Sequence, residues 1–353
     1  MCGTGGATVT EKEPERPKGL NNPAVKTLTT EDGDIIDCVD IYKQPAFDHP
    51  LLRNHTIEMR PSFIPRVAEG NGSLRFLTRQ IWQKNGSCPV GTIPVQRIRE
   101  TNFTRISGAS KNFSSDAEFA NCRVEIARVE NHRGGPHFGA QGTISVWNLD
   151  VMMMEWSLNS VTLFDVHDSF MEAGWAVGPI LFEDVKPRLF VNWLDTSADM
   201  GCFNLRCPGF VQVSNWIVLG GVLPKISTIK WWMLFEGEPV GYWPSSLFEN
   251  WETGPRVNWG GSVCNTEYQN YHTLTQMGSG HFPREGWRRA SYVRNLIVMT
   301  PNLDPVPPRH YKNSATSGGC YGVGDAARFP GDLGPAIYYG GPGGKCCNGG
   351  CKK

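Results

Sequence analysis

Two short segments, Glu172-Ala173-Gly174-Trp175 and Trp259-Gly260-Gly261-Ser262, decide how the second half of the chain folds. Each places a tryptophan beside glycine in a stretch rich in β-branched and aromatic residues, which is typical of a strand. Side chains alternate between the two faces of a strand. The two tryptophans are therefore expected to point into a core, and Glu172 and Ser262 to point away from it.

Further segments of the same kind surround these two motifs. Glycine, proline or aspartate turns separate them, at the spacing of an antiparallel sandwich or barrel. We expect strands at 143–148, 156–164, 170–177, 188–194, 210–219, 229–235, 256–263, 271–277 and 291–298. Helix is scarce, with one turn expected at 245–251. The predicted fold class is mainly β: an antiparallel β-sandwich preceded by a small mixed α/β domain.

The first part of the chain differs in composition from the second. Of 12 tryptophans only Trp82 precedes residue 137, and Gly134-Gly135-Pro136 marks the seam. We therefore divide the chain into an unstructured N-terminus (1–24), a small domain with its linker (25–136) and a β domain (137–353). The polar stretch 105–120 is expected to be an exposed loop, where proteases cut.

Charge and hydropathy exclude several classes of partner. The 34 Lys and Arg balance 34 Asp and Glu, and the pI is about 7.1. This balance argues against nucleic-acid binding and against a polybasic membrane surface. Apolar runs stay well below the roughly 18 residues of a transmembrane helix. We expect a monomer without a nucleic-acid or membrane partner.

Cysteines and glycosylation acceptors indicate the secretory pathway. The chain has 11 cysteines, and five N-x-[ST] acceptors crowd into its first third. These acceptors are Asn54, Asn71, Asn85, Asn102 and Asn112. Residues 1–20 show no apolar core of a signal peptide. Either the start is incomplete, or this form stays inside the cell.

Common catalytic motifs are missing from the sequence. There is no G-x-S-x-G elbow and no H-E-x-x-H zinc motif, so neither a metal nor another cofactor is expected. Cys202 and Cys207 fit either half of a zinc site or a local disulfide, and the lack of a matching pair favours the disulfide. Glu172 fits either a functional carboxylate or solvated surface.

Several segments of the chain resemble the neprosin family of plant secreted glutamic peptidases. In the β domain these are Glu172-Ala173-Gly174-Trp175, residues 201–210 (GCFNLRCPGF), Gly241-Tyr242-Trp243-Pro244, Trp259-Gly260-Gly261 and residues 276–283 (QMGSGHFP). Residues 32–38, 43–50 and 86–94 are similar to the family's activation peptide.

The resemblance implies a β-sandwich peptidase behind a removable, inhibitory pro-domain, with cleavage after proline in acid through two glutamates. Two facing carboxylates cannot both ionise cheaply, so they share a proton. One then activates water and the other protonates the leaving amine. The first glutamate falls on Glu172, but the second position holds Ser262, which cannot ionise. Glu267 and Glu285 are the alternatives, without support from their spacing.

The resemblance also assigns the residues around this site. Gly174, Gly260, Gly261, Tyr242 and Trp243 are expected to line the substrate site. Glycines on a strand let another backbone approach closely, as an extended peptide requires. The connection at 224–231 is about 20 residues shorter than is usual in the family. We expect this loss to change strand pairing there and to expose a sheet edge.

Three disulfides are expected. Cys202 pairs with Cys207 because they are close in sequence, and Cys38 pairs with Cys88 so that the pro-domain can leave. Cys320 pairs with one of the C-terminal cysteines at 346, 347 and 351.

Two functions from different classes stay open. The first is a secreted prolyl endopeptidase zymogen, whose partners are proline-containing peptides and its own pro-domain. The second is a non-catalytic relative that binds proline-rich peptides or wall polymers through an aromatic groove. The resemblance favours the first function, and Ser262 favours the second.

Overall fold

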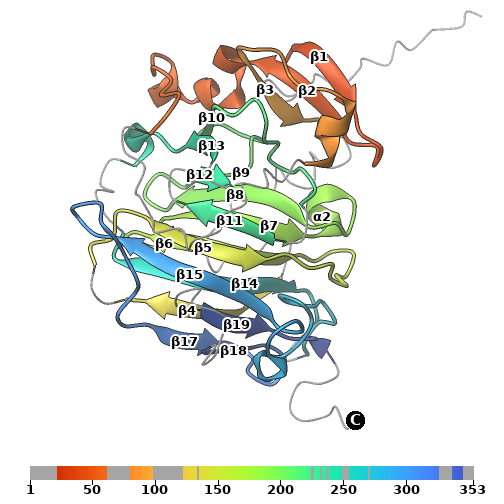
Figure 1. Ribbon diagram of the computed structural model, residues 1–353, viewed down its shortest axis with the longest axis vertical. Coiled ribbons are helices and arrows are strands. Elements are labelled where there is room, and N and C mark those ends of the chain that lie inside the picture. The colour runs from red at the N-terminus through yellow and green to blue at the C-terminus, as the bar shows by residue number, and fades with distance from the viewer. Residues whose placement is uncertain are drawn as a thin grey trace, which may run out of the picture.

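The computed structural model describes residues 22–61, 80–97, 122–132, 135–223, 226–230, 233–235, 238–248, 254–268, 271–325 and 336–344. Within these ranges, strands form three antiparallel sheets of three, nine and seven strands. The two larger sheets stack face to face and the smallest sheet lies at one end of them (Figure 1). The predicted antiparallel β-sandwich is therefore confirmed.

The seven-stranded sheet carries both motifs that open the sequence analysis. Its strands, in spatial order, are β17 (Lys312–Ala315), β4 (Arg123–Asn131), β14 (Arg256–Asn265), β6 (Ser157–Phe164), β7 (Phe170–Val177), β8 (Arg188–Asp195) and β9 (Met200–Phe203). Its centre is regular: the pairings β14–β6, β6–β7 and β7–β8 run without a register shift. Neighbouring side chains on one face therefore form straight rows across the sheet.

The nine-stranded sheet covers one face of the seven-stranded sheet. Its strands are β10 (Val211–Gln212), β13 (Glu238–Tyr242), β12 (Met233–Phe235), β11 (Ile226–Lys230), β5 (Ala140–Ser145), β15 (Ser291–Met299), β19 (Ala336–Gly340) and β18 (Gly322–Asp325), and β16 (Pro305–Val306) pairs with β15. Strand β11 pairs with both β5 and β12. The sheet is thus continuous beside the short connection, and the expected exposed edge is wrong.

Two tryptophans join the sheets as the alternation predicts. Trp175 and Trp259 are both fully buried between the sheets. Their indole N–H groups donate to β5 carbonyls, Trp175 to Ser145 at 3.0 Å and Trp259 to Gln141 at 2.9 Å. Each ring therefore supplies apolar area to the core and satisfies its polar atom across it, which buried tryptophans require.

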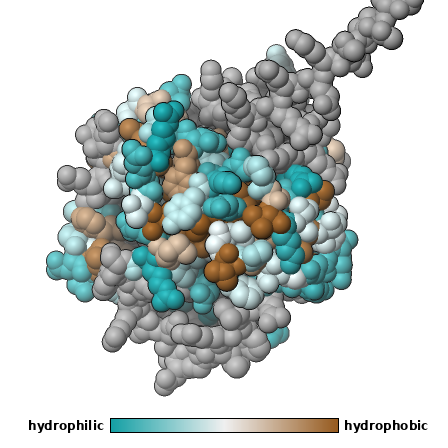
Figure 2. Space-filling model, turned by 90° about the horizontal axis from the view of Figure 1, so that it is seen from above, coloured by the Kyte–Doolittle hydropathy of each residue, from teal (hydrophilic) through white to brown (hydrophobic). Residues whose placement is uncertain are grey.

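The N-terminal unit docks on the β8–β9 and β10–β13 end of the sandwich. It consists of β1 (Ala24–Thr29), β2 (Ile35–Asp40) and β3 (Thr92–Gln96) with short 3₁₀ helices. Ile41 and Ile93 from this unit belong to the inter-sheet core. Across the interface, the side-chain amide of Gln44 donates to the backbone carbonyl of Gln212 and accepts from its backbone N–H. Seen from this end, apolar and polar residues are interspersed over the described surface (Figure 2).

The described helices are all short. They are α2 (Pro179–Phe182), η1 (Ile41–Lys43), η2 (Pro45–Asp48), η3 (Pro50–Leu52), η4 (Ile81–Asn85), η5 (Ser245–Leu247) and η6 (Pro283–Glu285). The turn expected at 245–251 is therefore present as η5. In the described part of the chain, no helix is long and apolar enough to span a membrane.

Two sequence expectations differ from the structure. No strand forms at 271–277, because the loop there is held by side-chain contacts to a buried glutamate. Only Val211–Gln212 is a strand within 210–219. Strand β4, in the segment assigned to the N-terminal domain and linker, pairs with β14 over nine residues.

Two of the expected disulfides are confirmed. Cys38–Cys88 and Cys202–Cys207 have Cα–Cα distances of 5.4 and 5.6 Å. A third, Cys122–Cys264, joins the start of β4 to β14 and was not predicted. Cys320 is disulfide-bonded, and its partner lies outside the described residues.

Two of the five glycosylation acceptors lie in the described part of the chain. Asn54 and Asn85 are exposed on the N-terminal unit, where a glycan would meet solvent. The acceptors at 71, 102 and 112 lie outside the described residues.

Candidate functional site

The face of the seven-stranded sheet that points away from the nine-stranded sheet is called the open face. Glu172 lies in the middle of a polar row on this face. Its register neighbours are Thr162 on β6 and Asn192 on β8. The carboxylate Oε1 accepts hydrogen bonds from Ser160 Oγ at 2.6 Å and Thr162 Oγ1 at 3.3 Å, and Oε2 accepts one from Asn192 Nδ2 at 3.4 Å. Three strands thus converge on one half-buried carboxylate.

Burial raises the pKa of Glu172 above its ordinary value, and outweighs the lowering by these three hydrogen bonds and by the charge of Arg128. The carboxyl group therefore holds its proton to a higher pH than a solvated glutamate. With serine at position 262, Glu172 has no second glutamate to repel its charge, and this alone predicts a pKa near the ordinary value of a glutamate. The structure differs because desolvation, rather than repulsion, raises the pKa.

Ser262 lies on the same sheet and on the same face. It pairs with Leu158 of β6, which is four residues along that strand from Thr162, the partner of Glu172. Two strand spacings and four residue rises put the two Cα atoms about 16 Å apart. Ser262 is half-buried. The face therefore has space at this position but no carboxylate.

The two glycines on this face are required by the sheet itself. A Cβ on Gly174 would lie 2.0 Å from the carbonyl oxygen of Asn159, and one on Gly260 would lie 2.5 Å from that of Ala127. Gly260 also has a φ of +148°, which other residues rarely adopt. These glycines thus permit the close approach of the neighbouring strand.

The structure does not bring the other expected substrate-binding residues to Glu172. Gly261 faces the inter-sheet core, where a Cβ would lie 2.8 Å from Met277 Cγ. Tyr242 on β13 packs with Met171, which points to the face opposite Glu172. Trp243 makes an edge contact with Phe210 at 4.9 Å in the same layer.

The N-terminal unit covers the hydroxyl of Tyr242. This oxygen accepts a hydrogen bond from the backbone N–H of Glu58 at 2.9 Å and lies 2.7 Å from His55 Nε2. Tyr242 therefore contributes to the docking of the N-terminal unit.

A second carboxylate on the open face was missed by the sequence analysis. Glu130 on β4 pairs with Asn258, which continues the row of Thr162 and Glu172. Burial raises the pKa of Glu130, but hydrogen bonds and charges from Arg128 and His132 lower it on balance. Polar residues at every second position, Arg128, Glu130 and His132, were the available signal. Glu130 is held by these two side chains, at 2.8 and 2.9 Å.

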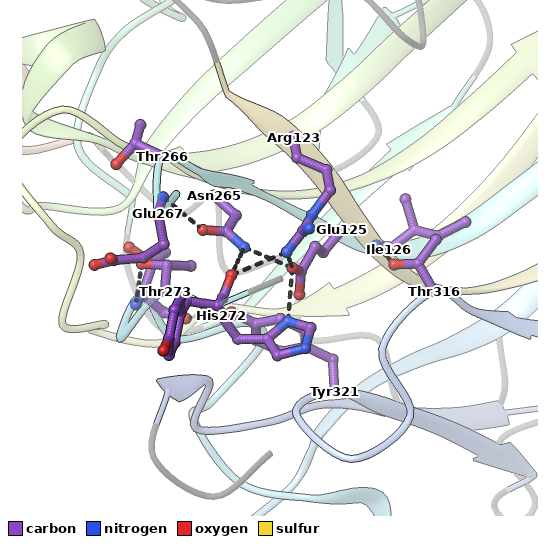
Figure 3. A network of polar contacts seen from close by, with 12 residues as sticks. Arg123, Glu125, Ile126, Asn265, Thr266, Glu267, His272, Thr273, Thr316 and Tyr321 are labelled. Carbon is purple, nitrogen blue, oxygen red and sulfur yellow. Dashed lines mark hydrogen bonds and ion pairs between the residues drawn. The ribbon is translucent and has the colours of Figure 1, made fainter. Parts of the chain in front are cut away.

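A separate polar network lies on the inner face, at the end of β4 and β14 (Figure 3). Glu125 Oε1 accepts hydrogen bonds from Arg123 at 2.9 Å and Asn265 at 2.7 Å, and lies 2.8 Å from His272 Nδ1. Glu125, His272 and Cys320 lie close enough to hold a metal ion. The sulfur of Cys320 is committed to a disulfide, so two ligands are left, fewer than a structural or catalytic zinc site uses.

Glu155 anchors the neighbouring loop of the same region. Its carboxylate accepts hydrogen bonds from the hydroxyls of Thr266, Thr273 and Thr275. Both carboxylates are fully buried and serve to fix the loops at this end of the sandwich.

Comparison with known families supplies the identity of the chain. The family model for neprosin matches residues 153–342, which is more than half of the chain. The model for the neprosin activation peptide matches residues 27–140. The chain belongs to the neprosin family and carries an activation-peptide domain in front of its neprosin domain.

Proposed function

We propose that the chain is the secreted zymogen of a glutamic-type endopeptidase that cleaves after proline in acid, with Glu172 as its proton donor. The observation that carries this proposal is the environment of Glu172. Its carboxyl group lies on the face of the seven-stranded sheet that points away from the inter-sheet core, and burial raises its pKa. A glutamate that keeps its proton in mild acid can protonate the leaving amine of a peptide.

The residues around Glu172 account for the proton donor of this reaction but not for its base. Ser160, Thr162 and Asn192 fix the carboxyl group in place, which limits the reorganisation needed during proton transfer. A base that activates water is expected at position 262, where serine stands. Turnover of the unmodified chain should therefore be slow.

The N-terminal unit is proposed to act as the inhibitor. Among the disulfides with both cysteines in the described residues, none joins this unit to the sandwich. The unit can therefore leave once the connecting chain is cut.

The second candidate is a non-catalytic relative that binds proline-rich peptides, and Ser262 is the observation that favours it. Acid-treated protein assayed on a proline-containing peptide separates the two. Slow post-proline cleavage that Glu172→Gln abolishes supports the peptidase. Glu238→Gln, at an exposed glutamate on β13, is the matched control and should change nothing. Binding without any cleavage would reject the peptidase.

A further inference from the structure

An acidic turn of the N-terminal unit is seated on cations of the sandwich. The turn joins β1 to β2 and contains Asp32 and Asp34. Asp34 accepts two hydrogen bonds from the buried guanidinium of Arg188, at 2.7 and 3.1 Å. Asp32 forms an ion pair with Lys186 at 2.8 Å. Such paired charge-assisted contacts are stronger than neutral hydrogen bonds.

Arg206 is a third cation at the same place, and it forms no ion pair among the described residues. Its guanidinium lies over the rings of Phe182 and Phe203, at 5.6 and 5.1 Å. Its Nη1 is buried without a hydrogen-bond partner in the described part of the chain. Burial, together with the charge of Arg188, lowers the pKa of Arg206 to about 10. An anion here would stabilise this uncompensated charge.

Arg206 lines a cavity of about 210 Å³ between the N-terminal unit and the sandwich. Residues 32–35 form one wall and residues 181–184 the other. On the sandwich side, Arg188 forms a second ion pair with Asp184, in addition to its ion pair with Asp34 of the turn. Departure of the N-terminal unit removes two carboxylates from this place and leaves all three cations behind.

Arg188 lies on the same face of the sheet as Glu172. In the β7–β8 register, Glu172 pairs with Asn192, and Arg188 lies four residues along β8. One strand spacing and four rises separate the Cα atoms of Glu172 and Arg188 by about 14 Å, which is the span of about four extended residues. A peptide held at Glu172 is long enough to reach the cations.

We propose that Lys186, Arg188 and Arg206 form an anion-binding subsite that the acidic turn occupies in the zymogen and an acidic residue of a peptide substrate occupies after its release. That the bound peptide is a substrate rests on the proposed peptidase function, but its binding to the subsite requires no catalysis. Guanidinium groups suit this ligand because they match a carboxylate with two parallel hydrogen bonds.

The test uses the intact chain with Asp32→Asn and Asp34→Asn, whose neutral turn binds the cations more weakly and is easier to displace. The probe is a fluorescent peptide with the sequence of residues 28–37, compared with the same peptide carrying asparagine at the positions of Asp32 and Asp34. Fluorescence anisotropy at pH 6 should show that the acidic peptide binds at least about tenfold more tightly than the asparagine peptide, because charge-assisted hydrogen bonds are lost in the latter. Equal affinity for the two peptides would overturn the proposal.

Two further substitutions locate the binding. Arg206→Gln, added to the same chain, should weaken the acidic peptide about tenfold. Lys312→Gln on β17, the exposed control on the same sheet, should not. If Arg206→Gln fails to fold, Lys186→Gln tests the subsite at a side chain that is 39% exposed. Unchanged affinity in a folded variant contradicts the proposal. Absence of proteolysis would reject the peptidase function alone, and cleavage without charge-selective binding would reject the subsite alone.

Discussion

Ser262→Glu is the substitution that best tests whether the open face is a catalytic site lacking one acid. The Cα atoms of residues 172 and 262 lie about 16 Å apart by strand geometry. A glutamate carboxylate reaches about 5 Å from its Cα. The two carboxylates could thus approach to no less than about 6 Å, near the lower end of the spacing at which paired carboxylates elsewhere hold an attacking water.

The new side chain has space, because Ser262 is half-buried and Leu158 and Ile126 flank it in the row. A second carboxylate on this face would raise the pKa of Glu172 further by repulsion. General acid–base groups contribute about 10² to 10⁴ in rate. We therefore expect kcat/KM for a post-proline peptide to rise by about this factor in acid.

The assay compares acid-treated protein as the unmodified chain, Ser262→Glu, Ser262→Gln and the double variant Ser262→Glu with Glu172→Gln. Ser262→Gln has the same length without the charge and should stay slow. The double variant should lose the gain, because the two groups act as a unit. Fast cleavage by the unmodified chain, unaffected by any change at 262, would show that another group is the base. Glu130→Gln would then identify or exclude the remaining described carboxylate of this row.

Three further predictions concern His49, Trp175 and the N-terminus of the mature protein. Burial lowers the pKa of His49, and its Nδ1 accepts the Leu51 N–H, so the folded state favours the neutral ring and loses stability as pH falls below about 6.5. His49→Asn, which accepts the same bond but cannot gain a proton, should flatten the fall in thermal stability between pH 7 and 4; an equally steep fall would contradict this role. Trp175→Phe removes the bond to Ser145 and should cost about 2 kcal/mol by urea unfolding, against almost nothing for the exposed Trp216→Phe. Mass spectrometry of the mature protein should find its N-terminus before Cys122, because β4 belongs to the sandwich; a start after residue 132 would refute this.

Strand alternation made the central part of the fold predictable. Trp175 and Trp259 are fully buried on the face that alternation assigns to the core, and Glu172 and Ser262 lie on the other face of the same strands. The ends of the sheets were not predictable in this way. At 271–277 the hydroxyls of Thr273 and Thr275 bond to Glu155, more than 100 residues earlier, and this contact replaces strand pairing. A sequence pattern cannot reveal such a distant partner.

The candidate site was likewise predictable only in part. Glu172 could be found from its motif, but Ser160, Thr162 and Asn192 reach it only through the register of three strands. The short-range disulfide Cys202–Cys207 was predictable from its spacing. Cys122–Cys264, separated by 142 residues, required the pairing of β4 with β14 to be known.

Opposite faces of β14 perform different tasks, and this explains how a neprosin fold can persist with serine at position 262. Trp259 and Val263 face the inter-sheet core and are fully buried, so their loss would open a cavity. Gly260 is fixed by the carbonyl of Ala127 and by its positive φ. Ser262 faces outward in the same strand, away from the inter-sheet core, so a change between glutamate and serine leaves the packing of that core intact. The acid can therefore be lost or restored at this position with little effect on stability, and a measured free energy of unfolding for Ser262→Glu within about 0.5 kcal/mol of the unmodified chain would bear this out.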